Sequence, residues 1–290
     1  MGYNTKKDSY QKKINRINEQ TQKESGKLLA GLILSLILMF LFPLLGILCL
    51  FVFVYPSMKK ITDSGKRTKQ EVGQEIIRDI MDQLFDQAEY LPDHRLPDAL
   101  IHSVSIPGLD RFDRIYGNDY ISGVFHGLNF EMSDITLTQI HEVTDSDGRE
   151  RTEEKEKFNG LWFVCDFAKQ IDSSISISPR PSFSLRKGIS LESEEFNRRM
   201  LVESDSEHDV YYVLTPSLME QILNTMKQMK CHLYFFFSQD GHVHILLDRG
   251  NALEISAPVR DVDQLHQQFT RQLRQVTEII DQLRLSEAYR

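Results

Sequence analysis

An uninterrupted apolar run from Leu28 to Tyr55 constrains this chain more than any other feature. Its 28 residues carry no charge, and lysines flank it on both sides. The run is too long for a buried core helix and long enough to cross the ~30 Å hydrocarbon core of a bilayer. A secretory signal has a shorter apolar core followed by a small-residue cleavage site, which this run lacks. We therefore expect a retained segment whose partner is the lipid bilayer, contacted through Leu28 to Tyr55.

Two arrangements of this run remain open, a single tilted span kinked at Pro43 and a short hairpin that turns near Phe42. Seven lysines and arginines precede the run and six follow it closely, so the positive-inside rule assigns no orientation. A segment that enters and leaves on one face would have two basic flanks, as here. The arms of a hairpin would be about 22 and 18 Å long at 1.5 Å per residue, so it would be re-entrant or would thin the bilayer.

Charge separates the membrane-proximal part of the chain from the remainder. Residues 1–69 contain 12 Lys and Arg against 4 Asp and Glu, whereas residues 70–290 contain 22 against 38. A basic collar suits anionic headgroups, while an acidic body repels the phosphates of nucleic acids. We therefore expect no nucleic-acid partner.

Cysteine usage bears on the compartment. Cys49, Cys165 and Cys231 are odd in number and widely spaced, with no Cys-x-x-Cys pair, and the chain has no Asn-x-Ser/Thr glycosylation motif. Exported domains of this size often carry paired cysteines. This pattern favours a cytoplasmic soluble part.

The first half of the soluble part predicts a helix followed by strands. Apolar residues at helical spacing indicate an amphipathic helix over residues 68–90, and alternation indicates two or three antiparallel strands between Tyr120 and Val143. The charged stretch Thr144 to Lys157 predicts a mobile hairpin loop, followed by a strand over residues 161–167. Pro179 and Pro181 would restrict any strand near them to an edge of the sheet.

The second half predicts two helices and three strands. Tyr211 to Leu214 is expected to form a strand that leads into a helix capped by Thr215, with Pro216 at its first position. Strands are expected over residues 231–238 and 242–247, joined by a tight turn at residues 239–241. The last helix is predicted from about Asp261 to Leu285; its apolar seam favours packing onto the sheet, although a coiled coil would also use it.

These elements predict an α+β fold, in which an N-terminal transmembrane or re-entrant helical segment precedes an antiparallel-sheet domain with flanking amphipathic helices. The expected divisions are a basic polar tail (1–27), the membrane segment (28–55), an amphipathic connecting helix (56–92), a soluble α+β domain (93–260) and a C-terminal amphipathic helix (261–290). About 220 residues outside the membrane segment are enough for a real core.

Three segments resemble DUF3137, a family of bacterial membrane-anchored proteins of unknown function. They are residues 112–123 (Phe-Asp-Arg-Ile-Tyr-Gly-Asn-Asp-Tyr-Ile-Ser-Gly), residues 158–163 (Phe-Asn-Gly-Leu-Trp-Phe) and residues 211–219 (Tyr-Tyr-Val-Leu-Thr-Pro-Ser-Leu-Met). The resemblance covers most of the region from Tyr55 to Ala257. It implies an N-terminal hydrophobic anchor and an α+β domain in a bacterial cell membrane, and no activity. Family members often have two distinct spans, from which the compact run here departs.

Two motifs resemble parts of metal-binding sites, but each lacks ligands that such a site needs. Residues 145–148 (Asp-Ser-Asp-Gly) begin like a calcium loop, but such loops place glycine sixth and an oxygen ligand fifth, where this chain has Arg149. His242 and His244 would lie on one face of a strand, but a site needs further ligands, and His232 starts at the far end of the paired strand. We expect no metal and no cofactor.

The charged residues around Phe112 are the candidates for catalysis. Asp110, Asp113 and Asp119, with Arg111 and Arg114, could act as acid and base or hold a cation for phosphoryl chemistry. Salt links at the start of a sheet are the commoner use of such residues, and we assign no catalytic residue. Nearby, Gly160 predicts a turn or bulge. Trp162 and Phe163 should point to opposite faces, leaving one available to a partner.

From these observations we expect a membrane-anchored binding or scaffold module with an unknown protein partner. One alternative is an enzyme that acts on a membrane-linked or phosphorylated substrate through residues 110–119. Another is a lipid or small-ligand carrier, which would require an apolar pocket.

Overall fold

The chain forms two compact units. The computed structural model describes residues 3–144, 150–181, 187–255, 259, 261–283 and 285. The first unit consists of Met1–Ile80 and Glu254–Arg271, and the second of Met81–Leu253 and Gln272–Arg290. Two helices, α5 (Gln74–Leu84) and α10 (Val262–Gln282), begin in the first unit and end in the second.

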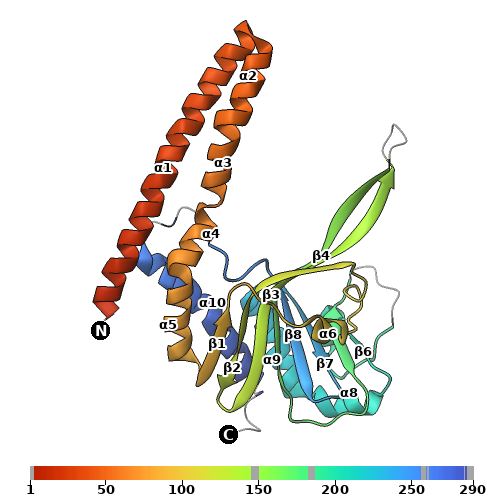
Figure 1. Ribbon diagram of the computed structural model, residues 1–290. Helices are drawn as coiled ribbons and strands as arrows, with labels where there is room; N and C mark the ends of the chain where they lie inside the picture. Colours follow the sequence, from red (N-terminus) through yellow and green to blue (C-terminus); the bar gives the residue numbers. More distant parts are fainter. Residues whose placement is uncertain are drawn as a thin grey trace. The chain divides into compact units, whose positions relative to one another are not determined.

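A helical hairpin forms the N-terminal part of the first unit (Figure 1). Its first arm is α1 (Tyr3–Leu41), and its second arm consists of α2 (Pro43–Cys49), the π-helical η1 (Leu50–Val54) and α3 (Tyr55–Thr62). Helical segments Lys6–Leu41 and Pro43–Thr62 are both long and apolar enough to cross a membrane. Of the two arrangements that the sequence left open, the structure has the hairpin.

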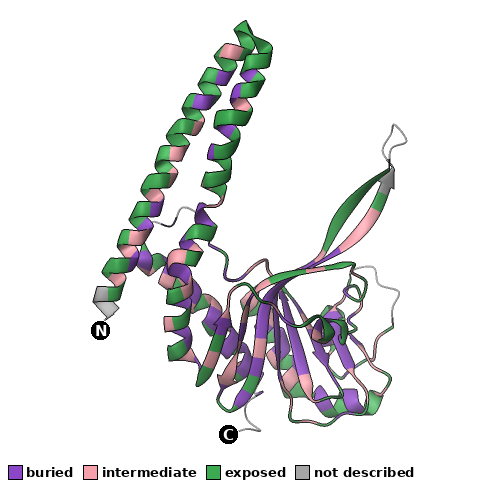
Figure 2. Ribbon diagram, viewed as in Figure 1, coloured by how far each residue is buried: buried purple, intermediate pink, exposed green. Residues whose placement is uncertain are grey.

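Small side chains fill the seam between the two arms. The buried positions of the hairpin include Gly31 and Ser35 on the first arm and Gly46 and Cys49 on the second. A Cβ atom at Gly46 would lie 2.6 Å from Cα of Met39, so only glycine permits this close approach. The large apolar side chains point outward, and the hairpin is therefore mostly exposed (Figure 2).

Below the hairpin, α1 packs against the helical segments that follow it. These segments are α4 (Ser64–Thr68), the π-helical η2 (Lys69–Gly73) and α5. Residues buried in this unit come from α1, from η2 and α5, and from the first half of α10: Tyr10, Ile14, Ile17, Val72, Ile76, Ile77, Val262, Leu265 and Phe269. Polar contacts accompany them, because Lys13 pairs with Glu75 at 3.2 Å and the Asn18 amide donates to the Val259 carbonyl at 2.6 Å.

The second unit is built on an eight-stranded antiparallel sheet with the order β1-β2-β3-β4-β8-β7-β5-β6. The strands are β1 (Gln87–Leu91), β2 (Arg114–Phe125), β3 (Leu128–Thr144), β4 (Glu150–Asp166), β5 (Ile175–Pro179), β6 (Met200–Glu203), β7 (His232–Phe237) and β8 (His242–Asp248). Together with its helices, this sheet confirms the predicted α+β fold.

Apolar residues cover both faces of the sheet. On one face, the segment around α6 (Asp98–His102) packs Leu96, Ile101 and Ile106 against Trp162 and Leu246. The other face lies against α9 (Pro216–Met229) and the second half of α10 (Figure 1). Two shorter helices, α7 (Glu194–Arg199) and α8 (Glu207–Val213), flank β6 in the chain.

The predicted cap of α9 corresponds to the structure. Thr215 Oγ1 accepts a hydrogen bond from the Leu218 N–H at 3.3 Å, and Pro216 occupies the first turn, where no donor is needed. The two strands β7 and β8 and their tight connection also lie where the sequence placed them.

Two predicted elements are wrong. The helix predicted over residues 68–90 ends at Leu84, and Gln87–Leu91 form β1, which is stabilised by its pairing with β2. The strand predicted at Tyr211 to Leu214 belongs instead to α8, because Ser206 caps a helix by accepting from the Asp209 N–H at 3.2 Å.

Three predictions within the sheet also differ from the structure. β5 is an interior strand, and Pro179 is tolerated because the pairing of β5 with β7 ends at Ile177. Gly160 lies inside a paired strand rather than at a turn, while the register shift occurs at Lys157. Trp162 is 2% exposed and Phe163 is 1% exposed, so neither is available to a partner.

We predict that Gly160→Ala destabilises the sheet. A Cβ atom at Gly160 would overlap the carbonyl oxygen of Leu247 on β8, so the two central strands would have to separate. We expect a loss of about 3 kcal/mol in the free energy of unfolding, measured by urea titration of the full chain in detergent micelles with Trp162, the single tryptophan, as fluorophore.

The matched control is Gly26→Ala, where an added methyl meets no atom within 4 Å in a helix. It should leave stability unchanged or raise it by up to about 1 kcal/mol. Equal stability of the two variants would contradict the close approach at Gly160.

Candidate functional site

The most prominent surface feature of the second unit is a two-stranded ribbon formed by the far ends of β3 and β4 (Figure 1). Pairing of β2 with β3 reaches Thr138, and pairing of β8 with β4 reaches Gly160. Beyond these points, residues 139–144 pair only with residues 150–155. The ribbon therefore leaves the sheet without a neighbouring strand on either side. The sequence predicted a strand for its first arm, up to Val143, and a loop where the second arm lies.

Backbone hydrogen bonds hold this ribbon together, because it has almost no apolar side chain to bury. All residues from Glu150 to Glu156 are exposed. Residues of one strand alternate between the two faces, and cross-strand partners share a face. The predicted calcium loop, residues 145–148, lies outside the described residues.

Alternation sorts the charges of the ribbon by face. The register places Ile140 opposite Glu154, Glu142 opposite Thr152, and Thr138 opposite Glu156. One face thus carries Glu142, Glu150, Glu154 and Glu156, whereas the other carries Arg151, Lys155, His141 and Glu153. The two faces present opposite charge to any partner.

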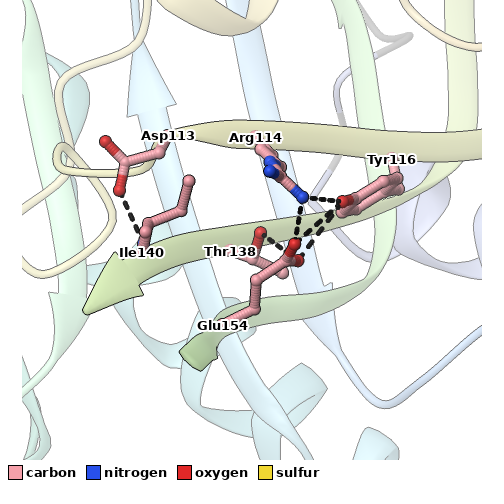
Figure 3. Close-up of polar contacts among 6 residues, drawn as sticks. All are labelled: Asp113, Arg114, Tyr116, Thr138, Ile140 and Glu154. Atoms are coloured by element: carbon pink, nitrogen blue, oxygen red, sulfur yellow. Dashed lines mark hydrogen bonds and ion pairs between the residues drawn. The ribbon is translucent and has the colours of Figure 1, made fainter. Parts of the chain in front are cut away.

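A polar cluster fastens the base of the ribbon on its acidic face (Figure 3). Arg114 of β2 forms an ion pair with Glu154 and donates to the Tyr116 hydroxyl at 3.3 Å. The Tyr116 and Thr138 hydroxyls both donate to the Glu154 carboxylate at 3.2 Å. The hydrogen bond to Tyr116, followed by the charge of Glu154, raises the pKa of Arg114. Because the cluster is exposed, it orients the ribbon more than it stabilises the fold.

The residues considered as an acid and base cluster divide into a group before and at the start of β2 and the more distant Asp119. Asp110 and Arg111 lie exposed before β2, and Asp113 accepts a hydrogen bond from the Ile140 N–H at 2.7 Å (Figure 3). Asp119 lies within β2, six residues after Asp113, which immediately precedes that strand; six extended residues span roughly 20 Å. Their carboxylates therefore cannot act on one substrate atom.

Asp119 has a local structural role. It is 1% exposed and adopts φ of 60°, a left-handed conformation that aspartate tolerates better than most residues. Its carboxylate accepts hydrogen bonds from the Tyr90 hydroxyl and the Asn118 amide. These contacts stabilise the bulge that separates Asn118 from Ile121 in the β2–β3 register.

A buried polar pair that the sequence did not reveal lies between β4 and β8. The Trp162 indole N–H donates to Nδ1 of His244 at 3.2 Å, and His244 is 1% exposed. Burial lowers the pKa of His244 to about 4, helped by the charge of His242. His244 is therefore neutral at physiological pH and accepts a hydrogen bond. The alternation of histidines was visible in the sequence, but its partner on another strand was not.

The other histidines of the predicted metal motif do not complete a site. His242 lies near Asp240, at 3.2 Å, and His232 pairs with Asp248 at the opposite end of β8. In the described part of the chain, no three His, Cys, Asp or Glu side chains are arranged to hold a metal ion.

A pocket of about 340 Å³ lies beside α9 in the second unit. Its lining is mainly apolar and includes Phe167, Val213, Leu218, Leu283 and Leu285. Lys169 also lines it and donates from Nζ to the Tyr212 carbonyl at 2.8 Å. Partial burial lowers the pKa of this lysine. The volume falls within the range of small-ligand sites.

A comparison of the chain with known families finds a match over part of the sheet unit. Residues 156–285 match the family DUF3137, a protein of unknown function. This match confirms the resemblance predicted from sequence. The motifs at residues 158–163 and 211–219 lie inside the matched range, whereas the motif at residues 112–123 precedes it. No curated protein and no solved structure matches the chain.

The DUF3137 match begins where the ribbon ends. It contains the core half of β4, strands β5 to β8 and helices α7 to α10. The Trp162 and His244 pair and the pocket beside α9 lie within it, and the acidic face of the ribbon lies almost entirely before it.

We predict that acid weakens the DUF3137 region through His244. Its pKa is about 4 in the folded chain and ordinarily 6.5, so the unfolded chain binds the proton more readily. Stability is thus fully present above pH 6.5 and falls as the pH drops towards 4, by about 3 kcal/mol at 1.36 kcal/mol per pKa unit. Urea titrations at several pH values, read from Trp162 fluorescence, measure this loss.

The control for this prediction is His244→Gln, which keeps an acceptor for Trp162 and removes the titrating group. Its stability should change less between pH 7 and pH 4 than that of the native chain, whatever its absolute value. Parallel curves for the two proteins would show that His244 does not cause the loss.

Proposed function

We propose that this protein is a membrane-anchored binding or scaffold module, held to a lipid bilayer by its helical hairpin. The observation that carries this proposal is the inverted pattern of the hairpin, with small residues in its seam and large apolar residues outside. Among the described residues, all exposed large hydrophobic side chains lie between Leu29 and Met58 except three tyrosines. Membrane helices pack through small residues in this way, because lipid solvates the outer face.

The free energy of moving the exposed apolar side chains from water into lipid also favours a membrane location. Burying one large apolar side chain that water would otherwise contact contributes about 1.5–3 kcal/mol. Side chains such as Phe40, Leu44 and Phe51 are 91%, 84% and 68% exposed, so each would gain much of this contribution in lipid. Few monomeric soluble proteins expose an apolar surface of this extent.

The polar ends of the hairpin suit a membrane interface. Glu24 accepts from Lys27 at 2.8 Å and lies 3.5 Å from Lys60 of the second arm. These hydrogen bonds, with that of Lys27 first, lower the pKa of Glu24. Lysines at this level can contact anionic headgroups. We propose that the protein lies in a bacterial cell membrane with its sheet unit in the cytoplasm, where Cys165 and Cys231 of that unit remain reduced.

The ribbon is our candidate for the surface that binds a protein partner. It projects from the sheet, carries opposite charges on its two faces, and pairs with no further strand along its outer edges. Unpaired strand edges and charged faces are features by which proteins recognise extended segments. Its acidic face disfavours nucleic acid as the partner.

A second candidate function is the binding of a small amphiphilic ligand. The pocket of about 340 Å³ beside α9 favours it, with an apolar lining and the Lys169 ammonium at its wall. We do not favour the enzyme alternative through residues 110–119, because Asp119 is buried and its carboxylate is bonded to Tyr90 and Asn118.

We predict that lysines on the outer face of the hairpin release the protein from membranes. The double variant Leu36→Lys, Phe51→Lys places a charge on each arm at positions 67% and 68% exposed. Each charge costs roughly 3 kcal/mol near the centre of a span. Flotation of the full chain with phosphatidylcholine vesicles should therefore fall from nearly complete to negligible.

The matched control is Tyr211→Lys, at an exposed position outside the hairpin. It should float like the native chain at both low and high salt. A native chain that stays at the bottom of the gradient would contradict membrane anchoring.

We also predict that the ribbon can be removed without loss of the fold. Replacing residues 142–152 by Asn-Gly leaves the His141 and Glu153 pair at the new turn and keeps Arg114 and Glu154 in contact. Thermal unfolding and vesicle flotation should be unchanged, because the ribbon pairs only with itself. Proteins that co-purify with the native chain should be lost.

The second variant for comparison is Glu142→Lys, Glu150→Lys. It keeps the ribbon and reverses the charge at two positions of its acidic face. It should lose partners that recognise the acidic face. Recovery of the same proteins by the ribbon-deleted chain would refute the ribbon as the binding surface.

A further inference from the structure

The tip of the hairpin is its most apolar part. All residues from Leu36 to Leu48 are apolar, and the turn lies at their centre. Phe40 and Leu44, on the two sides of the turn, are the most exposed of the large hydrophobic side chains in the described residues. A tip that emerged into water would expose these side chains at a large free-energy cost.

The backbone of the turn is also suited to a medium without water. The Phe42 N–H donates to the Leu38 carbonyl at 2.6 Å, while the N–H groups of Leu45 and Gly46 both donate to the Phe42 carbonyl. Pro43 has no N–H to satisfy. Most N–H groups of the turn are therefore hydrogen-bonded within the protein or absent. A backbone inside hydrocarbon must meet this condition, because no water is present to accept from its N–H groups.

The uncharged part of each arm is shorter than a bilayer is thick, although the helical segments that contain these parts, Lys6–Leu41 and Pro43–Thr62, are longer. Between Lys27 and the turn, α1 contributes 14 uncharged residues, and 15 residues lie between Pro43 and Lys59. At 1.5 Å per residue these arms reach about 21 and 22 Å, against the ~30 Å of a hydrocarbon core. With its lysines at one interface, the hairpin ends before the opposite interface.

The two ends of the hairpin are held together outside the apolar zone. Arg16 of α1 pairs with Glu71 of η2 at 3.0 Å, and Lys6 pairs with Asp79 of α5 at 2.8 Å. The segment before the hairpin and the segment after it thus belong to one helical packing unit. Both must lie on the same side of the membrane.

We propose that the hairpin enters and leaves the bilayer from one face and that its tip, Phe40 to Leu44, ends within the hydrocarbon. The protein is then monotopic, and no part of the hairpin reaches the water on the far side. This inference rests on the proposed membrane anchoring and specifies its topology. The alternative is two short spans that thin the bilayer and expose the tip on the far side.

Cysteine accessibility tests this topology. In the full chain with Cys49→Ala, Cys165→Ala and Cys231→Ala, a single cysteine is introduced by Leu44→Cys at the tip or by Ser25→Cys, an exposed position next to the base. Each protein is bound to preformed vesicles of phosphatidylcholine containing phosphatidylglycerol. A charged, membrane-impermeant maleimide is added outside or is enclosed in the vesicle lumen beforehand.

We expect the Ser25→Cys protein to react with outside reagent alone, whereas the Leu44→Cys protein reacts with neither reagent until detergent is added. Maleimide requires a hydrated thiolate, which hydrocarbon does not permit. Reaction of the tip with lumenal reagent, or with outside reagent while the chain is vesicle-bound, overturns the topology alone. A chain that fails to bind the vesicles overturns membrane anchoring and this topology with it.

A second pair of variants gives an independent measurement. Leu44→Arg should weaken vesicle partitioning by about 10-fold or more if the tip lies in hydrocarbon. Ser25→Arg should leave partitioning unchanged or strengthen it, since it adds a cation at the headgroup level. Equal partitioning of these two variants would place the tip in water and refute the proposal.

Discussion

The free-energy cost of leaving a large apolar surface in water governs the first unit. The outer face of the hairpin is apolar from Leu29 to Met58 apart from its flanking residues, so the stable environment of this part is lipid. The same constraint explains the residues in the seam. In lipid no hydrophobic effect drives two helices together, so they associate through close packing, which small residues such as Gly31 and Gly46 permit. The ion pairs of Glu24 and the basic flanks then mark where the apolar environment ends.

One strand organises the second unit. β4 begins as an arm of the exposed ribbon and ends in the centre of the sheet, where it pairs with β3 and β8. Its character changes within a few residues, from exposed glutamates to the buried Phe158 and Trp162. The register shift at Lys157 and the missing side chain at Gly160 lie at this change. The same strand thus connects the candidate binding surface to the core.

Features that depend on neighbouring residues could be predicted from the sequence, whereas contacts between residues far apart in the chain could not. The cap at Thr215 and the hairpin of β7 and β8 depend on neighbouring residues, and the sequence placed them correctly. The strand β1 was missed because pairing with β2 outweighs its helical periodicity. The second arm of the ribbon was missed because residues 150–156 are all exposed and carry no apolar alternation that would indicate a strand. The His244 and Trp162 pair joins residues 82 positions apart, a distance that no spacing rule covers.

Because the two arms of the ribbon pair only with each other, the length of the ribbon can change in evolution without a change in the sheet. Adding two residues to each arm would extend its reach by about 7 Å and keep every existing side chain on its present face. Adding one residue to each arm near the base would exchange the faces, and the glutamates would point where Arg151 and Lys155 point now. Related chains can therefore retune the reach and the polarity of this arm by small insertions, without altering the sheet that carries it.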